Sequence, residues 1–200
     1  MKKILSVIGF CLFAVQANAG LIFQDDFGTG TNTKHNLGQI FGNWKVTSSN
    51  VETWNNQGFS GYSMDLNGQG RALGAIQTTE LFSLEAGSQY TLSFLLGNNY
   101  DSKNSFDNGL IYGIRTANND TLFSGTIEFL SVFLNGEEKK TVTIEFKTVQ
   151  DLEASIFFES TGRSDNGGAI IDNVKLVPEP SNIALLALGF LGLAARRFKK

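Results

Sequence analysis

The chain has 200 residues, of which 42% are hydrophobic and 18% are charged; this length suits one domain, and the composition is too apolar for a disordered chain. Its 22 glycines and 17 phenylalanines, against 2 prolines, favour turns and strands over helices. Positive charge gathers at the two ends, so residues 20–177 hold 18 acidic and 10 basic residues and carry a net charge of −8. Phosphate backbones repel such a body, which excludes nucleic acid as a partner.

The first 19 residues have the three parts of a secretory signal peptide. Two lysines begin the segment, residues 4–15 form an apolar stretch, and Ala17-Asn18-Ala19 is a small-x-small cleavage site. The apolar stretch is too short to span a bilayer. We therefore expect export through the inner membrane. Cys11, the one cysteine of the chain, lies in this segment, so the exported chain would have no disulfide.

Residues 20–176 have the pattern of one all-β domain. Apolar residues alternate with polar ones over residues 90–96, 142–146 and 152–158, whereas no stretch sustains a helical period. Asn135-Gly136 between two apolar runs is the strongest hairpin signal. Less regular strands are expected over residues 51–54, 62–66, 72–78, 110–116 and 127–134.

Eight to ten short strands in a domain of this length favour a two-sheet jelly-roll β-sandwich over an open sheet. Phenylalanine side chains are then expected to fill the space between the sheets. Residues 87–94 and 169–176 resemble matching strands of the galactose-binding-like jelly rolls, and residues 23–27 and 44–46 follow the order of that group. The resemblance covers roughly residues 21–177 and implies the fold of many extracellular carbohydrate-binding modules.

Asp172 is an acidic residue in an apolar strand. In strict alternation it shares a face with Ile170 and Val174, where a bare carboxylate is costly to bury. In the resembling modules this position helps to hold a structural Ca²⁺ together with an acidic residue of the first loop, which Asp25 or Asp26 would match. The alternative is that Asp172 lies at a strand end or bulge and accepts hydrogen bonds from backbone N–H groups.

Candidate sugar-binding side chains are the aromatic residues that could form an exposed platform: Trp44, Trp54, Tyr62 and Tyr100. No group points to catalysis. His35 is the only histidine, so a relay of two histidines is impossible, and no pair among the acidic residues stands out as a glycosidase pair. We therefore expect a protein that is not an enzyme, with a secreted polysaccharide-active enzyme as the alternative.

The last segment, residues 177–200, has three parts in order. Pro178-Glu179-Pro180 contains both prolines of the chain and predicts an extended spacer. An uninterrupted apolar stretch follows at residues 183–195, which is short for a transmembrane helix, and a basic cluster at residues 196–200 is expected to stay cytoplasmic.

This order resembles the PEP-CTERM sorting signal, a segment also labelled the ice-binding protein C-terminal motif. The resemblance implies that exosortase, a membrane protease, recognises Pro178, Glu179 and Pro180, and that the helix serves as a membrane anchor. Sorting in that family accompanies exopolysaccharide production. The sequence thus predicts an exported β-sandwich protein, first anchored by its C-terminus, then placed at the cell surface or in the extracellular matrix, with extracellular polysaccharide as a candidate partner.

Overall fold

A computed structural model of the chain describes residues 20–28, 31–55, 59–69, 72–99, 108–128, 139–163 and 168–179. All regular elements within these ranges are β-strands, fourteen in number. In the part of the chain that is described, no helix is long and apolar enough to cross a membrane. The predicted signal peptide, the Asn135-Gly136 hairpin and the apolar helix of residues 183–195 lie outside the described residues.

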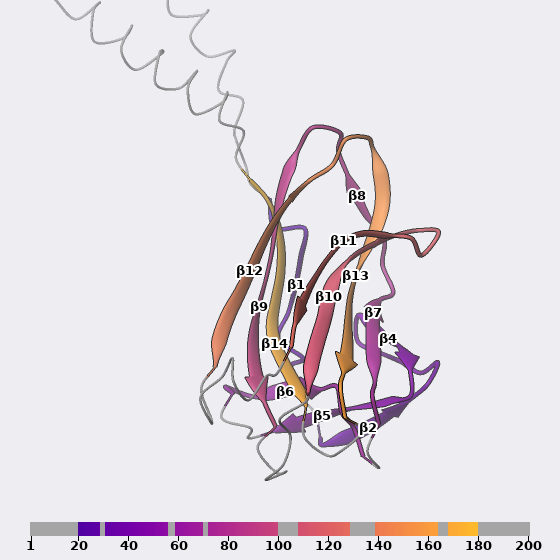
Figure 1. The fold of residues 1–200 in the computed structure, drawn as a ribbon, viewed down its shortest axis with the longest axis vertical. Helices are drawn as coiled ribbons and strands as arrows, with labels where there is room; N and C mark the ends of the chain where they lie inside the picture. Colours follow the sequence, from indigo (N-terminus) through magenta and orange to yellow (C-terminus); the bar gives the residue numbers. More distant parts are fainter. Residues whose placement is uncertain are drawn as a thin grey trace, which may run out of the picture.

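The strands form two seven-stranded sheets. The first sheet has the order β12 (Lys140–Lys147), β9 (Gln89–Asn98), β14 (Ala169–Pro178), β6 (Tyr62–Asp65), β5 (Asn50–Asn55) and β2 (Thr33–Asn36), with β1 (Phe23–Asp25) beside β14. The second sheet has the order β11 (Thr121–Ile127), β10 (Gly109–Thr116), β13 (Leu152–Thr161), β7 (Ala75–Thr78), β4 (Trp44–Ser48) and β3 (Ile40–Phe41), with β8 (Phe82–Leu84) beside β13. Neighbouring strands are antiparallel, and the long strands run lengthwise through the molecule (Figure 1). The predicted all-β sandwich of two sheets is confirmed.

The long strands follow the alternation of the sequence. In β9, Tyr90, Leu92, Phe94 and Leu96 all belong to the buried core, while the residues between them point away from it. The expected total of eight to ten strands is wrong. The additional strands β2, β3 and β8 contain four, two and three residues, too few for an alternating pattern to be visible in the sequence. The strand expected over residues 127–134 meets β11 only at Ile127, and residues 129–134 lie outside the described residues.

The core between the sheets is rich in aromatic rings. Phe158 of the second sheet meets Phe94 of the first sheet edge to face, with ring centroids 5.0 Å apart. Trp44 lies 5.8 Å from the same Phe158 ring and is itself 1% exposed. The contact of Phe94 with Phe158 crosses the sandwich, and together with the other buried rings it confirms that phenylalanine side chains fill the space between the sheets.

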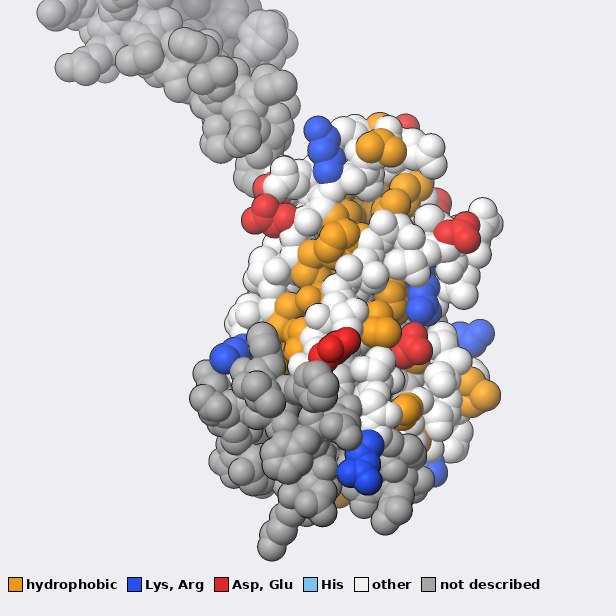
Figure 2. Space-filling view, viewed as in Figure 1, with side chains coloured by type: hydrophobic (Ala, Val, Ile, Leu, Met, Phe, Trp, Pro, Cys, Tyr) orange, Lys and Arg blue, Asp and Glu red, His pale blue; other side chains and the backbone are white. Residues whose placement is uncertain are grey.

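Apolar side chains are visible along one face of the molecule. Figure 2 shows apolar side chains as a band running lengthwise between polar flanks. Phe123 of β11 and Phe146 of β12 stack across the two sheets, with ring centroids 5.9 Å apart and an interplanar angle of 20°. This pair joins the edge strands of the two sheets.

We expect Phe158→Ala to lower the free energy of unfolding by about 3–5 kcal/mol, because it removes a fully buried ring and leaves a cavity between Phe94 and Trp44. Urea denaturation of residues 20–179 measures the change. Val149→Ala is the control, since Val149 is 88% exposed, and it should change stability by less than about 0.5 kcal/mol. Equal losses for the two variants would contradict this description of the core.

Candidate functional site

Strand β14 occupies the middle of the first sheet. One of its edges pairs with β9 from Ala169 to Pro178. The other edge pairs first with β6, at Ile170 and Ile171, and then with β1, at Val174 to Leu176. Asp172 lies in the gap between these two partners, next to the loop that follows β1.

A β-bulge in β14 changes which residues face the core. The register against β9 shifts between Asp172 and Lys175, and Asn173 has a φ of 50°. Ile171 before the bulge and Val174 after it both belong to the core, so the alternation changes phase between them. The expectation that Asp172 shares a face with Val174 is therefore wrong, because strict alternation does not continue through the bulge.

Asp172 is nevertheless buried, with 1% of its surface exposed. Its Oδ1 atom accepts a hydrogen bond from the backbone N–H of Asn173 at 2.7 Å. The pKa of Asp172 is raised to about 6, mainly by burial; the Asn173 hydrogen bond opposes the rise, and the negative charges of Asp26 and Asp25 add to it. The three acidic residues that the sequence singled out are therefore near enough to repel one another.

Asp25 links the first strand to the core. Its Oδ1 accepts the backbone N–H of Phe27 at 2.7 Å, while Oδ2 accepts the Asn43 amide at 2.9 Å and the Trp44 indole N–H at 3.0 Å. Asp26 is less constrained, with one hydrogen bond to its Oδ1 from the backbone. Asp25 thus already has a structural role in fixing the Trp44 ring.

The donor chemistry of this cluster suits a hard cation, because carboxylate oxygens are the ligands that calcium prefers. Within the described ranges, however, no group of three or more Asp, Glu, His or Cys side chains is arranged to hold a metal ion. Asp25, Asp26 and Asp172 could supply only part of a calcium shell, and backbone carbonyls or water would have to complete it.

The candidate aromatic platform is not assembled by the fold. Trp44 is buried in the core, and Tyr100 lies outside the described residues. Trp54 and Tyr62 are half-buried on neighbouring strands, but Trp54 is paired with Ser63, so Tyr62 points to the opposite face of the sheet. These residues do not form one sugar-stacking surface.

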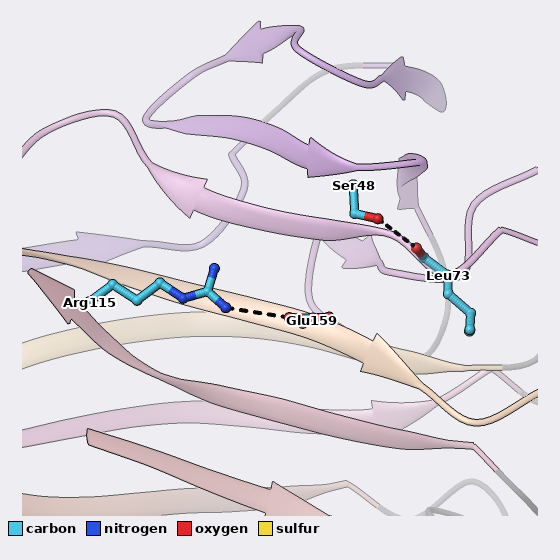
Figure 3. A network of polar contacts seen from close by, with 4 residues as sticks. All are labelled: Ser48, Leu73, Arg115 and Glu159. Carbon is cyan, nitrogen blue, oxygen red and sulfur yellow. Dashed lines mark hydrogen bonds and ion pairs between the residues drawn. The ribbon is translucent and has the colours of Figure 1, made fainter. Parts of the chain in front are cut away.

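A different polar surface lies on the outer face of the second sheet. Phe157 points away from the core, and the Arg115 guanidinium lies over its ring at 3.8 Å from the centroid. Arg115 also pairs with Glu159 at 3.4 Å, as Figure 3 shows along β13. Beside them the Gln77 amide donates to the Ser155 hydroxyl at 2.7 Å. This surface could not be predicted from the sequence, because its residues come from three strands.

A second buried carboxylate, Asp65, lies on β6 opposite Glu52 of β5. Its oxygens accept the Asn67 backbone N–H at 2.8 Å and the Asn99 side-chain amide at 2.6 Å. The pKa of Asp65 is raised to about 6, mainly by burial; the two hydrogen bonds oppose the rise, and the charge of Glu52 adds to it. Two carboxylates directly opposite each other in a sheet are destabilising.

The beginning of the sorting motif is part of the folded domain. Strand β14 continues to Pro178, which pairs with Tyr90 of β9. The backbone N–H of Glu179 donates to the Gln89 carbonyl at 2.8 Å, and the Glu179 carboxylate accepts the Thr91 hydroxyl at 2.7 Å. The expected spacer is extended at these positions, but it extends as a strand of the sheet. Pro180 lies outside the described residues.

Comparison with known proteins identifies this C-terminal segment. Residues 176–200 match the family described as the PEP-CTERM protein-sorting motif. The match begins at Leu176, inside β14, and confirms the resemblance of the last segment to an exosortase sorting signal. No curated protein matches the sequence of the chain significantly.

Solved structures are similar to the sandwich. An arabinose-bound MgGH51 α-L-arabinofuranosidase superposes with a TM-score of 0.51 at 14% identity over 80% of this chain, which spans 27% of that enzyme's length. A xylan-binding domain from CBM 22 gives a TM-score of 0.46 at 12% identity, covering 80% of this chain and 96% of that one. TmCBM61, in complex with β-1,4-galactotriose, gives 0.41 at 16% identity, covering 68% and 88%. At 14% identity, the likeness to the arabinofuranosidase shows the fold alone.

The Asp65–Glu52 pair predicts a pH dependence of stability. Because the pKa of Asp65 is raised from 3.8 to about 6 by folding, the folded state binds the proton more tightly, and stability falls as pH rises from about 4 to above 6. We expect Glu52→Gln to stabilise residues 20–179 by about 0.5–1 kcal/mol at pH 7.5, where both carboxylates are charged, and by almost nothing at pH 4. Glu80→Gln is the control, since exposed Glu80 faces no such partner. A gain that is equal at both pH values would contradict the interpretation.

Proposed function

We propose that this chain is an exported, non-catalytic protein that its PEP-CTERM signal delivers to the cell surface or the exopolysaccharide matrix. The observation that carries this proposal is the match of residues 176–200 to the sorting motif, directly continuous with the last strand of the domain. The predicted signal peptide supports the same route, because a sorting signal of this kind acts on a chain that has left the cytoplasm. The apolar segment of residues 183–195 would hold the chain in the membrane until exosortase acts.

For the domain itself we propose a jelly roll of the galactose-binding-like group that binds extracellular polysaccharide. What supports this is the surface of Arg115, Glu159 and Gln77 on the second sheet. The side chains of Arg115 and Glu159 are 19% and 42% exposed and pair with each other beside the buried Phe157 ring. Guanidinium and carboxylate groups form paired hydrogen bonds, which suits the adjacent hydroxyls of a sugar.

We also propose a structural calcium ion, bound with the help of Asp25, Asp26 and Asp172. The support is electrostatic: a buried carboxylate that feels two further negative charges is relieved by a divalent cation. Calcium in this position would join the loop after β1 to the last strand and stabilise the domain.

The sorting prediction concerns the motif directly. Replacement of Pro178, Glu179 and Pro180 by alanine should leave an unprocessed chain in the membrane fraction, because the recognition residues are removed while the apolar segment remains. Cell fractionation with an antibody against the domain measures the distribution. Release identical to that of the wild type would mean that the C-terminal segment is a plain anchor.

The carbohydrate prediction is tested on a glycan array with residues 20–179. We expect binding to one class of polysaccharide, and a loss of at least about tenfold in affinity for Arg115→Ala, since a charged hydrogen-bonding group is removed. Thr143→Ala on the exposed face of the other sheet is the control. Binding that is unaffected by Arg115→Ala would show that Arg115 is not part of the sugar-binding site. Turnover of the bound sugar would favour the alternative, a secreted polysaccharide-active enzyme.

The calcium prediction is a change in melting temperature. At a hundredfold excess over its Kd, calcium would stabilise the folded domain by about 2.7 kcal/mol, which raises the melting temperature by roughly 5–10 °C. Asp172→Asn should abolish this response and remain folded, because the amide oxygen can still accept the Asn173 N–H. Equal melting temperatures of the wild type in chelator and in millimolar calcium would refute the proposal that the domain binds calcium.

A further inference from the structure

The Glu residue of the sorting motif is bound to the domain that the motif follows. Glu179 is half-buried, and two different groups of β9 contact it. The Gln89 carbonyl accepts its backbone N–H at 2.8 Å, and the Thr91 hydroxyl donates to its Oε1 atom at 2.7 Å. A backbone contact and a side-chain contact therefore fix both parts of the residue that the sorting family presents for recognition.

The position of Thr91 follows from the alternation of β9. Tyr90 and Leu92 point into the core, so Thr91 points to the outer face of the first sheet, where it pairs with Val177 of β14. The chain passes from Val177 to Glu179 along this face, and the hydroxyl is within reach of the carboxylate. A hydrogen bond to a charged acceptor is about twice as strong as one between neutral groups.

The contacts of Glu179 with β9 compete with recognition of the motif by exosortase. A protease that reads Pro178-Glu179-Pro180 needs the Glu179 side chain and the adjoining backbone, and both are engaged by β9 while β14 stays fully paired. Few contacts hold this end of the strand, because Pro178 has no N–H to donate. The last residues can therefore detach without unfolding of the sandwich, as strand ends do.

From this geometry we propose that Thr91 is a positioning residue that holds the sorting motif against the folded domain and limits how often exosortase can bind it. The inference rests on the proposed sorting function. The rate of recognition is then proportional to the fraction of time that Glu179 is free. Loss of one hydrogen bond to a charged group at a partly exposed site should increase that fraction about five- to tenfold.

The test follows processing of the full chain in a host that expresses an exosortase. Pulse-chase labelling compares the wild type with Thr91→Val, which removes the hydroxyl but keeps the shape, and with Thr91→Ser, which restores a hydroxyl. Thr143→Val is the control, because Thr143 is an exposed threonine on the neighbouring strand β12 and pairs with Ser93 instead. We expect processing about five- to tenfold faster for Thr91→Val and a rate near the wild-type value for Thr91→Ser and Thr143→Val.

Hydrogen exchange at the Glu179 amide of the unprocessed chain measures docking independently of processing. It should become faster in Thr91→Val by a similar factor and stay near the wild-type rate in Thr91→Ser. Unchanged exchange, or processing of Thr91→Val that is unchanged or slower, would overturn the inference while leaving the sorting function intact. If the alanine replacement of the motif is still processed normally, the sorting function fails and the inference fails with it.

Discussion

The pairing of β14 is the constraint on which the rest of the molecule depends. This strand pairs with β9 along one edge, with β6 and β1 along the other, and it carries core residues at both of its ends. It is also the strand that leads into the sorting motif. Strand β14 therefore contributes to the stability of the sandwich and also leads directly into the sorting motif.

Buried negative charge also affects the stability of the domain. Residues 20–177 carry a net negative charge, and one acidic residue among them, Glu159, forms a salt bridge with Arg115. Asp172 of β14 and Asp65 of β6 are both buried, on neighbouring strands of the first sheet. Folding raises the pKa of each to about 6, mainly because burial disfavours the charged form. Such carboxylates weaken the fold near neutral pH unless a proton or a cation neutralises them.

The predictable parts of the structure are those with a long local pattern. Strands β9, β12 and β13 alternate over eight or ten residues, so the sequence shows both their extent and their buried face. The sorting motif is also local, since its three parts are consecutive. Strands of two to four residues leave no such pattern, which is why the expected strand total was too low.

The functional geometry was harder to predict, because it depends on register. A single bulge at Asn173 places Asp172 on the face opposite to the expected one. The face of Trp54 relative to Tyr62 follows from the pairing of β5 with β6, and the contact of Thr91 with Glu179 joins residues 88 positions apart. None of these relations can be predicted from a short segment of the sequence, because each depends on the register between strands.

The beginning of the sorting motif is a structural part of the sandwich, since Pro178 and Glu179 both pair with β9. Urea denaturation of two chains, residues 20–179 and residues 20–176, tests it most directly, since the shorter chain lacks Val177, Pro178 and Glu179. We expect the shorter chain to be less stable by about 1–2 kcal/mol, because it loses a backbone hydrogen bond to Gln89 and a charged one to Thr91. Coincident denaturation curves would contradict it and make the motif a free extension of the domain.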